Sequence, residues 1–442
     1  MRSLVSVTLL LAACGPTADL DLTLTQSEVI PTVFTAALDG EVSGLDAAWV
    51  EFGLDGDYDH AVQLDMDSDL PWELSLLGMK PGSDYDVRMA VEIDGETYTG
   101  RAHTAATGQV PSGFPDLGLE RGTGESFEGY LVAGMVGNST AATILDEDGE
   151  YVWWYQPDGF DQVGRTVLSR DGSAMLSIDL NAMGSENSRM VRVALDGSSE
   201  QTTSLPWAHH ELYEHSDGTI AYLAHDPADI DGSDVNGDSI VELNPDGSST
   251  VIWSAWDTLE RLPYVESTGG PGGGWPHANA LDYLPDEDAY LVSLLYMDAI
   301  LRIDRATGSL DWIMGGDYSD FELAGSGTDI FERTHQMHRL DDSILVFVNG
   351  DTEGGVSRAV EYSVDEESFE VETLWDYWSD PSMNCISLGD VHRFDSGNTL
   401  VTYSYSGQIQ EVTPEGEPTW ILSASAGGVI GYVTPVEDLY AD

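Results

Sequence analysis

Histidine is the residue type whose spacing in this sequence most favours a shared chemical site. His209 and His210 are adjacent, and His277 and His335 stand at comparable places in later segments of the chain. A neutral imidazole can attack an electrophile or accept a proton, and a protonated imidazole can stabilise negative charge that develops during a reaction. These four histidines are therefore our candidate catalytic residues.

The position of three of these histidines relative to the turn that follows predicts that they converge. Counted back from the last strand residue before that turn, His210 and His335 lie five positions upstream and His277 lies seven. Odd offsets place side chains on one face of an extended strand. A lone histidine near a strand start is more often structural, and His338 and His392, at an offset of two, keep that interpretation. We expect His210, His277 and His335 to meet at one end of a central channel.

An internal repeat supplies the strands that would position these histidines. From Glu125 onward, a strand, an Asp- or Gly-bearing turn and a second strand recur, and the second strand usually ends in tryptophan. The copies are Ile144–Trp153, Val191–Leu205, Ile240–Trp253, Ile300–Trp312, Ala359–Trp375 and Ile409–Trp420. A second kind of hairpin lies between them, so each repeat of roughly 50 residues has four strands. The sequence predicts an all-β fold with a six-bladed β-propeller; a pair of β-sandwiches is the alternative.

Shorter alternating stretches before the repeats predict a separate domain. Residues 25–106 have the pattern of a small antiparallel β-sandwich, and Leu77–Tyr85 resembles the turn and tyrosine entry of a fibronectin type III domain. Residues 107–124 are rich in Gly and Pro and are interpreted as a linker, which leaves residues 125–442 for the propeller.

The N-terminal segment has the pattern of a lipoprotein signal peptide. The apolar run Leu4–Leu11 is too short to span a bilayer, and small residues precede Cys14. Cleavage after residue 13 would leave Cys14 as a lipid-modified N-terminus, with residues 14–24 as a tether. An ordinary signal peptide with an incidental cysteine is the alternative. We expect a cell-envelope lipoprotein, periplasmic or at the outer-membrane face, that is held to the membrane by its lipid alone.

The charge of the chain excludes a nucleic-acid partner. The formal net charge is −63 and Lys80 is the only lysine, so the protein repels polyanions. An anionic substrate would therefore need local positive charge at its site. Apart from Cys14 the sequence has only Cys385, so the processed chain could form no internal disulfide.

One acidic run resembles part of a calcium loop. Asp234, Asn236 and Asp238 carry oxygen ligands at alternating positions, as an EF-hand-type loop requires at its start. The glycine and the final glutamate of such a loop are absent, so a solvated loop between blades is the favoured alternative. Zinc is disfavoured because neighbouring histidines in a strand point to opposite faces. We therefore expect no cofactor, with calcium as the single weak candidate.

Several motifs in residues 125–442 together resemble the bacterial arylsulfate sulfotransferases. They occur in the order and spacing of that family, and they are His209-His210-Glu211, Trp275–Leu281, Tyr290–Ser293, Ile303-Asp304, His335–Leu340, Val346–Gly350, Gly397–Leu400 and Gln410–Thr413. The resemblance implies a six-bladed propeller that moves a sulfuryl group from a phenolic sulfate donor to a phenol acceptor without a nucleotide cofactor.

The resemblance also implies roles for individual residues. His335 would be the nucleophile that carries the sulfuryl group, while His277 and one of His209 or His210 would bind sulfate oxygens and assist the leaving phenolate. Asn279, in the motif His-x-Asn, would contribute to substrate binding.

One position departs from the family pattern. Leu295 stands where these enzymes carry an arginine, which removes a bidentate donor for the anion. Arg333 and Arg339 flank His335 and are the candidates to replace it. Besides the enzyme, two interpretations stay open: a non-catalytic propeller that binds a ligand or a protein, which Leu295 favours, and a structural surface lipoprotein.

Overall fold

The computed structural model describes residues 20–38, 45–66, 72–137, 140–157, 159–160, 162–179, 184–264, 275–324, 330–350, 354–425 and 428–440. Cys14 and the expected signal peptide lie outside these residues. In the described ranges the chain is built of β-strands, with three short 3-10 helices, η1 (Ala255–Thr258), η2 (Leu295–Met297) and η3 (Ser404–Ser406). None of the described helices is long and apolar enough to cross a membrane.

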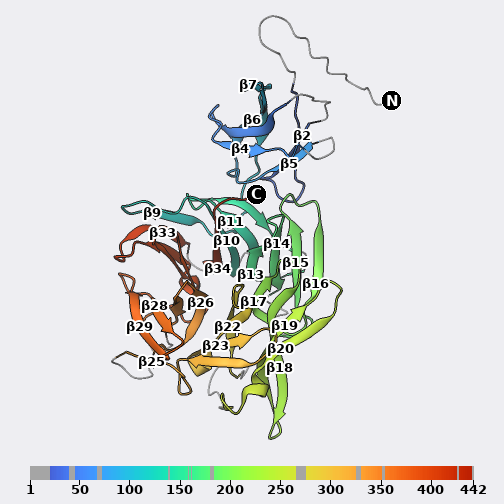
Figure 1. Cartoon of the computed structure of the whole chain (residues 1–442). Helices are drawn as coiled ribbons and strands as arrows, with labels where there is room; N and C mark the ends of the chain where they lie inside the picture. Colours follow the sequence, from blue (N-terminus) through green and yellow to red (C-terminus); the bar gives the residue numbers. More distant parts are fainter. Residues whose placement is uncertain are drawn as a thin grey trace, which may run out of the picture.

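The N-terminal part is a pair of packed sheets (Figure 1). One sheet has the order β1-β2-β5, and the other has the order β4-β3-β6-β7 with β8 also paired to β6. The strands are β1 (Thr23–Gln26), β2 (Phe34–Leu38), β3 (Ala47–Leu54), β4 (His60–Gln63), β5 (Trp72–Leu76), β6 (Asp84–Ile93), β7 (Glu96–Thr99) and β8 (His103–Ala106). Buried and more exposed residues alternate along β2 and β3, so that one face of each sheet forms a shared core around Phe52 and Met79.

The rest of the described chain forms six successive sheets of antiparallel hairpins, which we number in chain order. Sheet 1 contains β10 (Tyr130–Gly137), β11 (Ala141–Leu145), β12 (Tyr151–Tyr155) and β34 (Gly428–Val436). Sheet 2 contains β13 (Val163–Leu168), β14 (Ala174–Asp179), β15 (Arg189–Ala194) and β16 (Glu200–Ser204). Sheet 3 contains β17 (Ala208–Glu214), β18 (Ile220–Ile230), β19 (Ser233–Leu243) and β20 (Ser249–Ser254).

The last three sheets follow the same order. Sheet 4 contains β21 (Ala278–Leu284), β22 (Ala289–Leu294), β23 (Ala299–Asp304) and β24 (Leu310–Met314). Sheet 5 contains β25 (Glu322–Leu323), β26 (Thr334–Arg339), β27 (Ser343–Val348), β28 (Arg358–Asp365) and β29 (Glu370–Tyr377). Sheet 6 contains β30 (Asp390–Arg393), β31 (Thr399–Tyr403), β32 (Gln408–Val412), β33 (Pro418–Ala424) and β9 (Leu117–Arg121).

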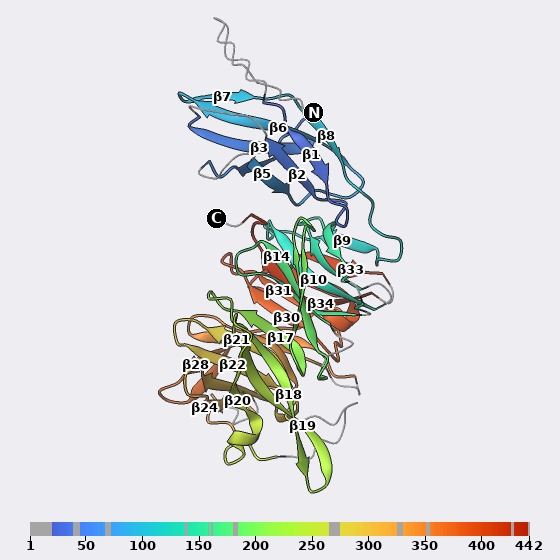
Figure 2. The same ribbon diagram turned by 90° about the vertical axis from the view of Figure 1, so that its right-hand side faces the viewer.

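The six sheets contact one another through a ring of inner strands. The order around this ring is β34, β13, β17, β21, β26, β30 and back to β34, each strand lying against the next. Two pairings join distant parts of the sequence: β34 near the C-terminus completes sheet 1 beside β10, and β9 adds to the outer strand of sheet 6. Figure 2 shows these sheets on one side of the N-terminal pair.

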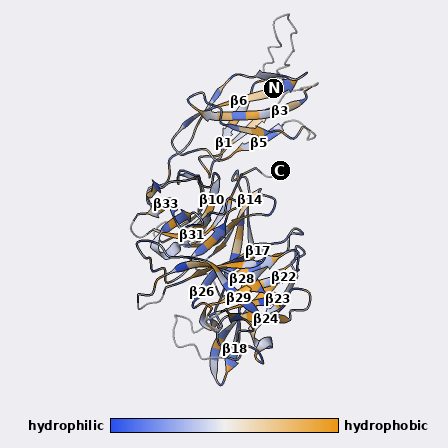
Figure 3. Ribbon diagram, turned by 60° about the vertical axis from the view of Figure 1, so that its left-hand side comes forward, coloured by the Kyte–Doolittle hydropathy of each residue, from blue (hydrophilic) through white to orange (hydrophobic). Residues whose placement is uncertain are grey.

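Burial follows the position of a strand within its sheet. Every residue of β14, β22, β27 and β31, the second strands of their sheets, is buried, because neighbouring sheets cover both faces. These strands are correspondingly apolar on both faces, and Figure 3 shows the hydrophobic colour along β22 and β23. The outer strand β16 is mostly exposed and polar. The apolar hairpins that repeat in the sequence therefore form a core lying between the sheets.

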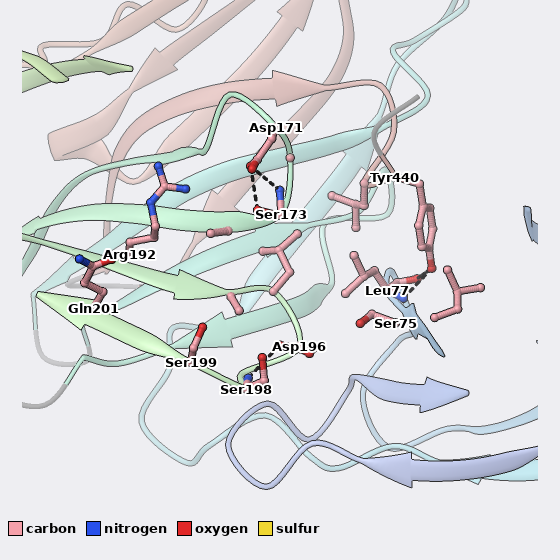
Figure 4. A pocket seen from close by; sticks show the side chains of 16 residues that line it. Ser75, Leu77, Asp171, Ser173, Arg192, Asp196, Ser198, Ser199, Gln201 and Tyr440 are labelled. Atoms are coloured by element: carbon pink, nitrogen blue, oxygen red, sulfur yellow. Dashed lines mark hydrogen bonds between the residues drawn. The ribbon is translucent and has the colours of Figure 1, made fainter. Parts of the chain in front are cut away.

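A groove of about 530 Å³ separates the N-terminal pair of sheets from sheet 2. Figure 4 shows Leu77 of the N-terminal part on one wall and Tyr440 near the C-terminus beside it. The hydroxyl of Tyr440 accepts a hydrogen bond from the Leu77 backbone N–H at 2.7 Å. Lys80 adds ion pairs to Asp146 and Glu150 at 3.3 and 3.0 Å. The contact between the two parts is thus partly apolar and partly ionic.

Candidate active site

Three histidines from three neighbouring sheets meet at the inner strands. His210 lies in β17, His277 immediately precedes β21, and His335 lies in β26. The ring centroid of His210 is 5.3 Å from that of His277 and 6.1 Å from that of His335. His335 is buried, whereas His210 and His277 are partly exposed. The three rings therefore converge, as expected from the sequence.

Bulges in the inner strands, rather than uninterrupted alternation, bring these rings together. The pairing register shifts in three of the strands, between His209 and Leu212, between Ala278 and Ala280, and between Thr334 and Met337. His210 and His277 have φ angles of 53° and 65°, in the left-handed region that strand residues rarely occupy. The count of odd offsets thus selected three residues that do converge, but uninterrupted alternation is not the reason, because each strand is bulged beside its histidine.

All three rings are held in their neutral form. Burial lowers the pKa of His335 to about 3 and the pKa of His277 to about 4. Burial, with the neighbouring histidines as a second cause, lowers the pKa of His210 well below its ordinary value. A neutral imidazole has a lone pair that can attack or accept a proton, so the cluster is suited to nucleophilic and basic chemistry at neutral pH.

His209 connects this cluster to a buried carboxylate. Its Nε2 lies 3.1 Å from Oδ1 of Asp238, and its Nδ1 lies 2.9 Å from Nδ1 of His210. Burial opposes the ionisation of Asp238, but contacts with His209 and His225 outweigh it and lower the pKa of this carboxyl, so that it stays ionised and accepts hydrogen bonds. Burial keeps His209 neutral, and the close contact with the carboxylate favours a proton on its Nε2, although this contact does not have the geometry of a full hydrogen bond. The proton between the two Nδ1 atoms then belongs to His210, whose lone pair is on Nε2.

Tyr432 assigns the same tautomer to His335. The Tyr432 hydroxyl donates to the backbone carbonyl of Asn279 at 3.4 Å, and its oxygen lies 3.4 Å from Nδ1 of His335. Burial raises the pKa of Tyr432 well above its ordinary value, so the hydroxyl keeps its one proton. With that proton on the carbonyl, the hydroxyl oxygen is the acceptor for Nδ1 of His335, and this arrangement leaves the lone pair on Nε2.

The predicted calcium residues lie along an extended strand. Asp234, Asn236 and Asp238 all belong to β19, which stays paired with β18 as far as the turn. Successive members are therefore spread along the strand instead of surrounding one point. The EF-hand-type loop was wrong, and so was the alternative of a loop between blades. Asp238 is instead part of the histidine network.

A family model for the arylsulfotransferases (ASST) matches residues 125–421 of the chain. The chain belongs to the arylsulfotransferase family. The match includes all the histidines described above and runs from before sheet 1 into the last hairpin of sheet 6. It supports an aryl sulfotransferase-like function.

Other comparisons add little about this arylsulfotransferase family member. No curated protein matches the chain. A protein of unknown function from Bacteroides caccae is 14% identical, with a TM-score of 0.46, over 70% of this chain and 100% of that one. An auxiliary nutrient binding protein from Bacteroides ovatus is 10% identical, with a TM-score of 0.40, over 94% of this chain and 91% of that one. Similarity at this level carries no argument about function.

The position of the missing family arginine adjoins the histidine cluster. The backbone N–H of Leu295, the first residue of η2, donates to the carbonyl oxygen of His277 at 2.9 Å. An arginine at this place would begin its side chain beside the site, whereas leucine offers no donor to an anion. Positive charge for an anionic ligand at this site would have to come from other residues.

Of the two flanking arginines, the structure brings only Arg333 to the cluster. After burial and neighbouring histidines, the charge of Arg333 is a further cause of the low pKa values of His277 and His335, so it lies within electrostatic range of both rings. Its Nε donates to the carbonyl oxygen of Gly350 at 3.2 Å. Arg339 instead pairs with Glu366 at 3.7 Å, outside the cluster.

Asn279 is buried directly beside the cluster. Its Nδ2 donates to the carbonyl oxygen of Thr334 at 3.0 Å. Its Oδ1 is buried and has no hydrogen-bond partner among the described residues. The free atom is an acceptor, which suits a hydroxyl of an acceptor phenol better than an oxygen of a sulfate.

Arg165 in β13 is a candidate residue that the sequence analysis missed. With His210 and Tyr432 it lines an enclosed cavity of about 50 Å³. Its Nε lies 2.7 Å from Oε1 of Glu211, and its Nη1 lies 3.6 Å from Oδ2 of Asp390. An arginine inside the largely apolar strand Val163–Leu168 was the available signal, because such a charge is costly to bury without partners. Its partners lie on other strands, and the sequence does not connect them to it.

Proposed function

We propose that the protein transfers a sulfuryl group between phenolic compounds through a covalent intermediate on His335. The observation that carries this proposal is the convergence of His210, His277 and His335 in a chain that belongs to the arylsulfotransferase family. The six sheets would be the blades of a six-bladed β-propeller, and the ring of inner strands supports that architecture.

The first half-reaction uses the lone pair of His335. Its Nε2 attacks the sulfur of the phenolic sulfate, the N–S bond forms, and the S–O bond to the aryl oxygen breaks as the phenolate leaves. The hydroxyl oxygen of Tyr432 accepts from Nδ1 and so stabilises the positive charge that this ring gains. Arg333 and Arg165 supply the nearest positive charge for the oxygens of the transferring group.

The second half-reaction uses the lone pair of His210. Its Nε2 takes the proton of the acceptor phenol while the phenol oxygen attacks sulfur and the N–S bond to His335 breaks. The proton on His210 is then available to the next phenolate that leaves. This assigns the acid–base role to His210 and makes His209 a positioning residue, which separates two histidines that the family resemblance left as alternatives.

The test is transfer from a chromogenic phenyl sulfate to a phenol, followed by mass spectrometry of the rapidly quenched enzyme without acceptor. We expect a sulfuryl adduct on the peptide that contains His335. Absence of both transfer and adduct across a panel of aryl sulfates would overturn the proposal.

A binding function is the second candidate, because Leu295 removes a donor beside the site. Such a protein would bind aryl sulfates without turnover. Equal affinity in wild type and in a His335→Ala variant, with no transfer by either, would favour a binding site elsewhere on the molecule.

We propose further that the protein is a lipoprotein of the cell envelope whose N-terminal domain is fibronectin type III-like. The small residues before Cys14 support lipid attachment, and labelled palmitate should enter wild type but not a Cys14→Ala variant. The hydroxyl of Tyr85 accepts a hydrogen bond from the Lys80 backbone N–H at 2.9 Å, as the tyrosine of such sandwiches does.

A further inference from the structure

We propose that His338, Asp390 and His392 bind one divalent transition-metal ion with the ligand preference of Zn²⁺. His338 lies in β26 and the other two residues lie in β30, the neighbouring inner strand. Their sequence positions suggested ordinary structural histidines. The inference does not depend on sulfuryl transfer.

The distances suit a common ligand. Nε2 of His338 lies 3.3 Å from Oδ1 of Asp390, and Nε2 of His392 lies 3.4 Å from Oδ2. The three ligand atoms lie within 4.8 Å of one another. Two ligands bound tetrahedrally to zinc at about 2.1 Å lie about 3.4 Å apart, so only small side-chain movements are needed to place an ion between them.

An unsatisfied atom points to a ligand at this place. Nε2 of His392 is buried and makes no hydrogen bond of good geometry among the described residues, since Oδ2 of Asp390, its nearest acceptor, lies 3.4 Å away. A buried ring nitrogen without a partner is costly, and a metal ion is one group that would satisfy its lone pair. Each histidine also contacts a different carboxylate oxygen, so the two nitrogens converge from separate directions.

The carboxylate is held in place by the backbone. Oδ1 of Asp390 accepts from the N–H of Val391 at 2.9 Å, and Oδ2 accepts from the N–H of Val433 at 3.1 Å. Such outer contacts orient a metal ligand and are typical of metal sites. The negative charge of Asp282 acts on both histidines and offsets the nearby charge of Arg165.

Solvent reaches the two rings but not all of the ligand atoms. The side chains of His338 and His392 are 23% and 16% exposed, whereas Asp390 and Nε2 of His392 are buried. An ion would therefore enter by a movement of the histidine rings, and water could complete its coordination, as in sites with two histidines and one carboxylate.

A second group of two histidines and one aspartate is less suited to binding a metal ion. It consists of His209, His225 and Asp238. Both of its histidines contact the same oxygen, Oδ1 of Asp238, while Oδ2 accepts from the Ala278 backbone N–H at 2.7 Å. The other nitrogen of His209 is engaged with His210. This group thus belongs to the hydrogen-bond network of the histidine cluster.

The experiment uses the full processed chain after treatment with a chelator. Zn²⁺ is titrated by calorimetry, and Co²⁺ is titrated as a spectroscopic probe of nitrogen and oxygen coordination. We expect one ion per chain, a binding constant at least about tenfold weaker in His392→Gln and His338→Gln, and an unchanged constant in the matched variant His225→Gln.

Two results would overturn the proposal: no binding by the wild-type chain, or binding that His225→Gln abolishes and His392→Gln leaves intact. Loss of folding is separated from loss of a ligand by near-ultraviolet circular dichroism and by thermal unfolding. Zn²⁺ should raise the unfolding temperature of wild type but not that of a folded His392→Gln variant.

Discussion

His335 and His338 lie on the same short strand, β26, yet their environments give them opposite properties. Burial lowers the pKa of His335 to about 3, and no carboxylate contacts its ring among the described residues. Burial, the largest single cause, also opposes the charge of His338, but the hydrogen bond and charge of Asp390 and the charge of Asp282 together outweigh it and raise the pKa of this ring. The nearest charged partner, rather than the residue type or the depth of burial, decides in which direction the pKa of a histidine on this strand shifts.

Removing the nucleophile should have the largest effect. His335→Ala should lower kcat by at least about 10⁴-fold, because no other ring can form the covalent intermediate. The assay is transfer from a chromogenic phenyl sulfate. His60→Ala, in the N-terminal sheets, is the control and should retain wild-type activity. Activity in His335→Ala near the wild-type level would show that the two ends of β26 do not differ in chemistry as proposed.

Changing the carboxylate behind His209 should have the next largest effect. The amide introduced by Asp238→Asn can donate to Nε2 of His209, so that the proton of this ring moves to Nδ1. Nδ1 of His209 then donates to His210, and His210 holds its own proton on Nε2 and has no lone pair there. The expected loss in kcat is about 100-fold or more. Nitrogen chemical shifts of His210 should report the other tautomer. Asp234→Asn, on the same strand but exposed, should change neither quantity.

An arginine at position 295, where the family pattern has one, should raise kcat instead of lowering it. Leu295→Arg places a charged donor beside His277, where a missing donor to a developing anion typically costs about 3 kcal/mol, or about 100-fold in rate. We expect kcat to rise by up to that factor, and Leu295→Met should leave it unchanged. A rate that falls in Leu295→Arg would indicate that Arg333 and Arg165 already occupy the anion's place.

The smallest effect concerns stability and pH. Burial lowers the pKa of His277 from 6.5 to about 4, so the unfolded chain takes up this proton before the folded chain does. The contribution of His277 to the free energy of unfolding is therefore fully present above about pH 6.5 and is lost as the pH falls towards 4. Denaturant unfolding of His277→Gln should therefore show a shallower decrease of the free energy of unfolding over this range. An identical slope in both proteins would show that His277 is not desolvated in the folded state.

The order of the hairpins could largely be predicted from the repeats in the sequence. Each predicted hairpin, such as Ile300–Trp312, has its own turn residues and apolar pattern, and these are local properties. The bulges were not visible, because a register shift depends on the partner strand as much as on the strand itself. Arg165 and Asp390 were missed for a related reason: each matters through contacts with strands far away in the sequence.

The pairing of β34 with β10 has a consequence for the order of events during synthesis. Tyr432, which directs the proton of His335, lies in this last strand, and β34 also closes the ring between sheets 6 and 2. A nascent chain can form the local hairpins of sheets 2 to 5 as they emerge, but sheet 1 lacks its inner strand until the final residues appear. Chains that end before β34 therefore contain every histidine of the site but lack Tyr432 and the strand that closes the ring.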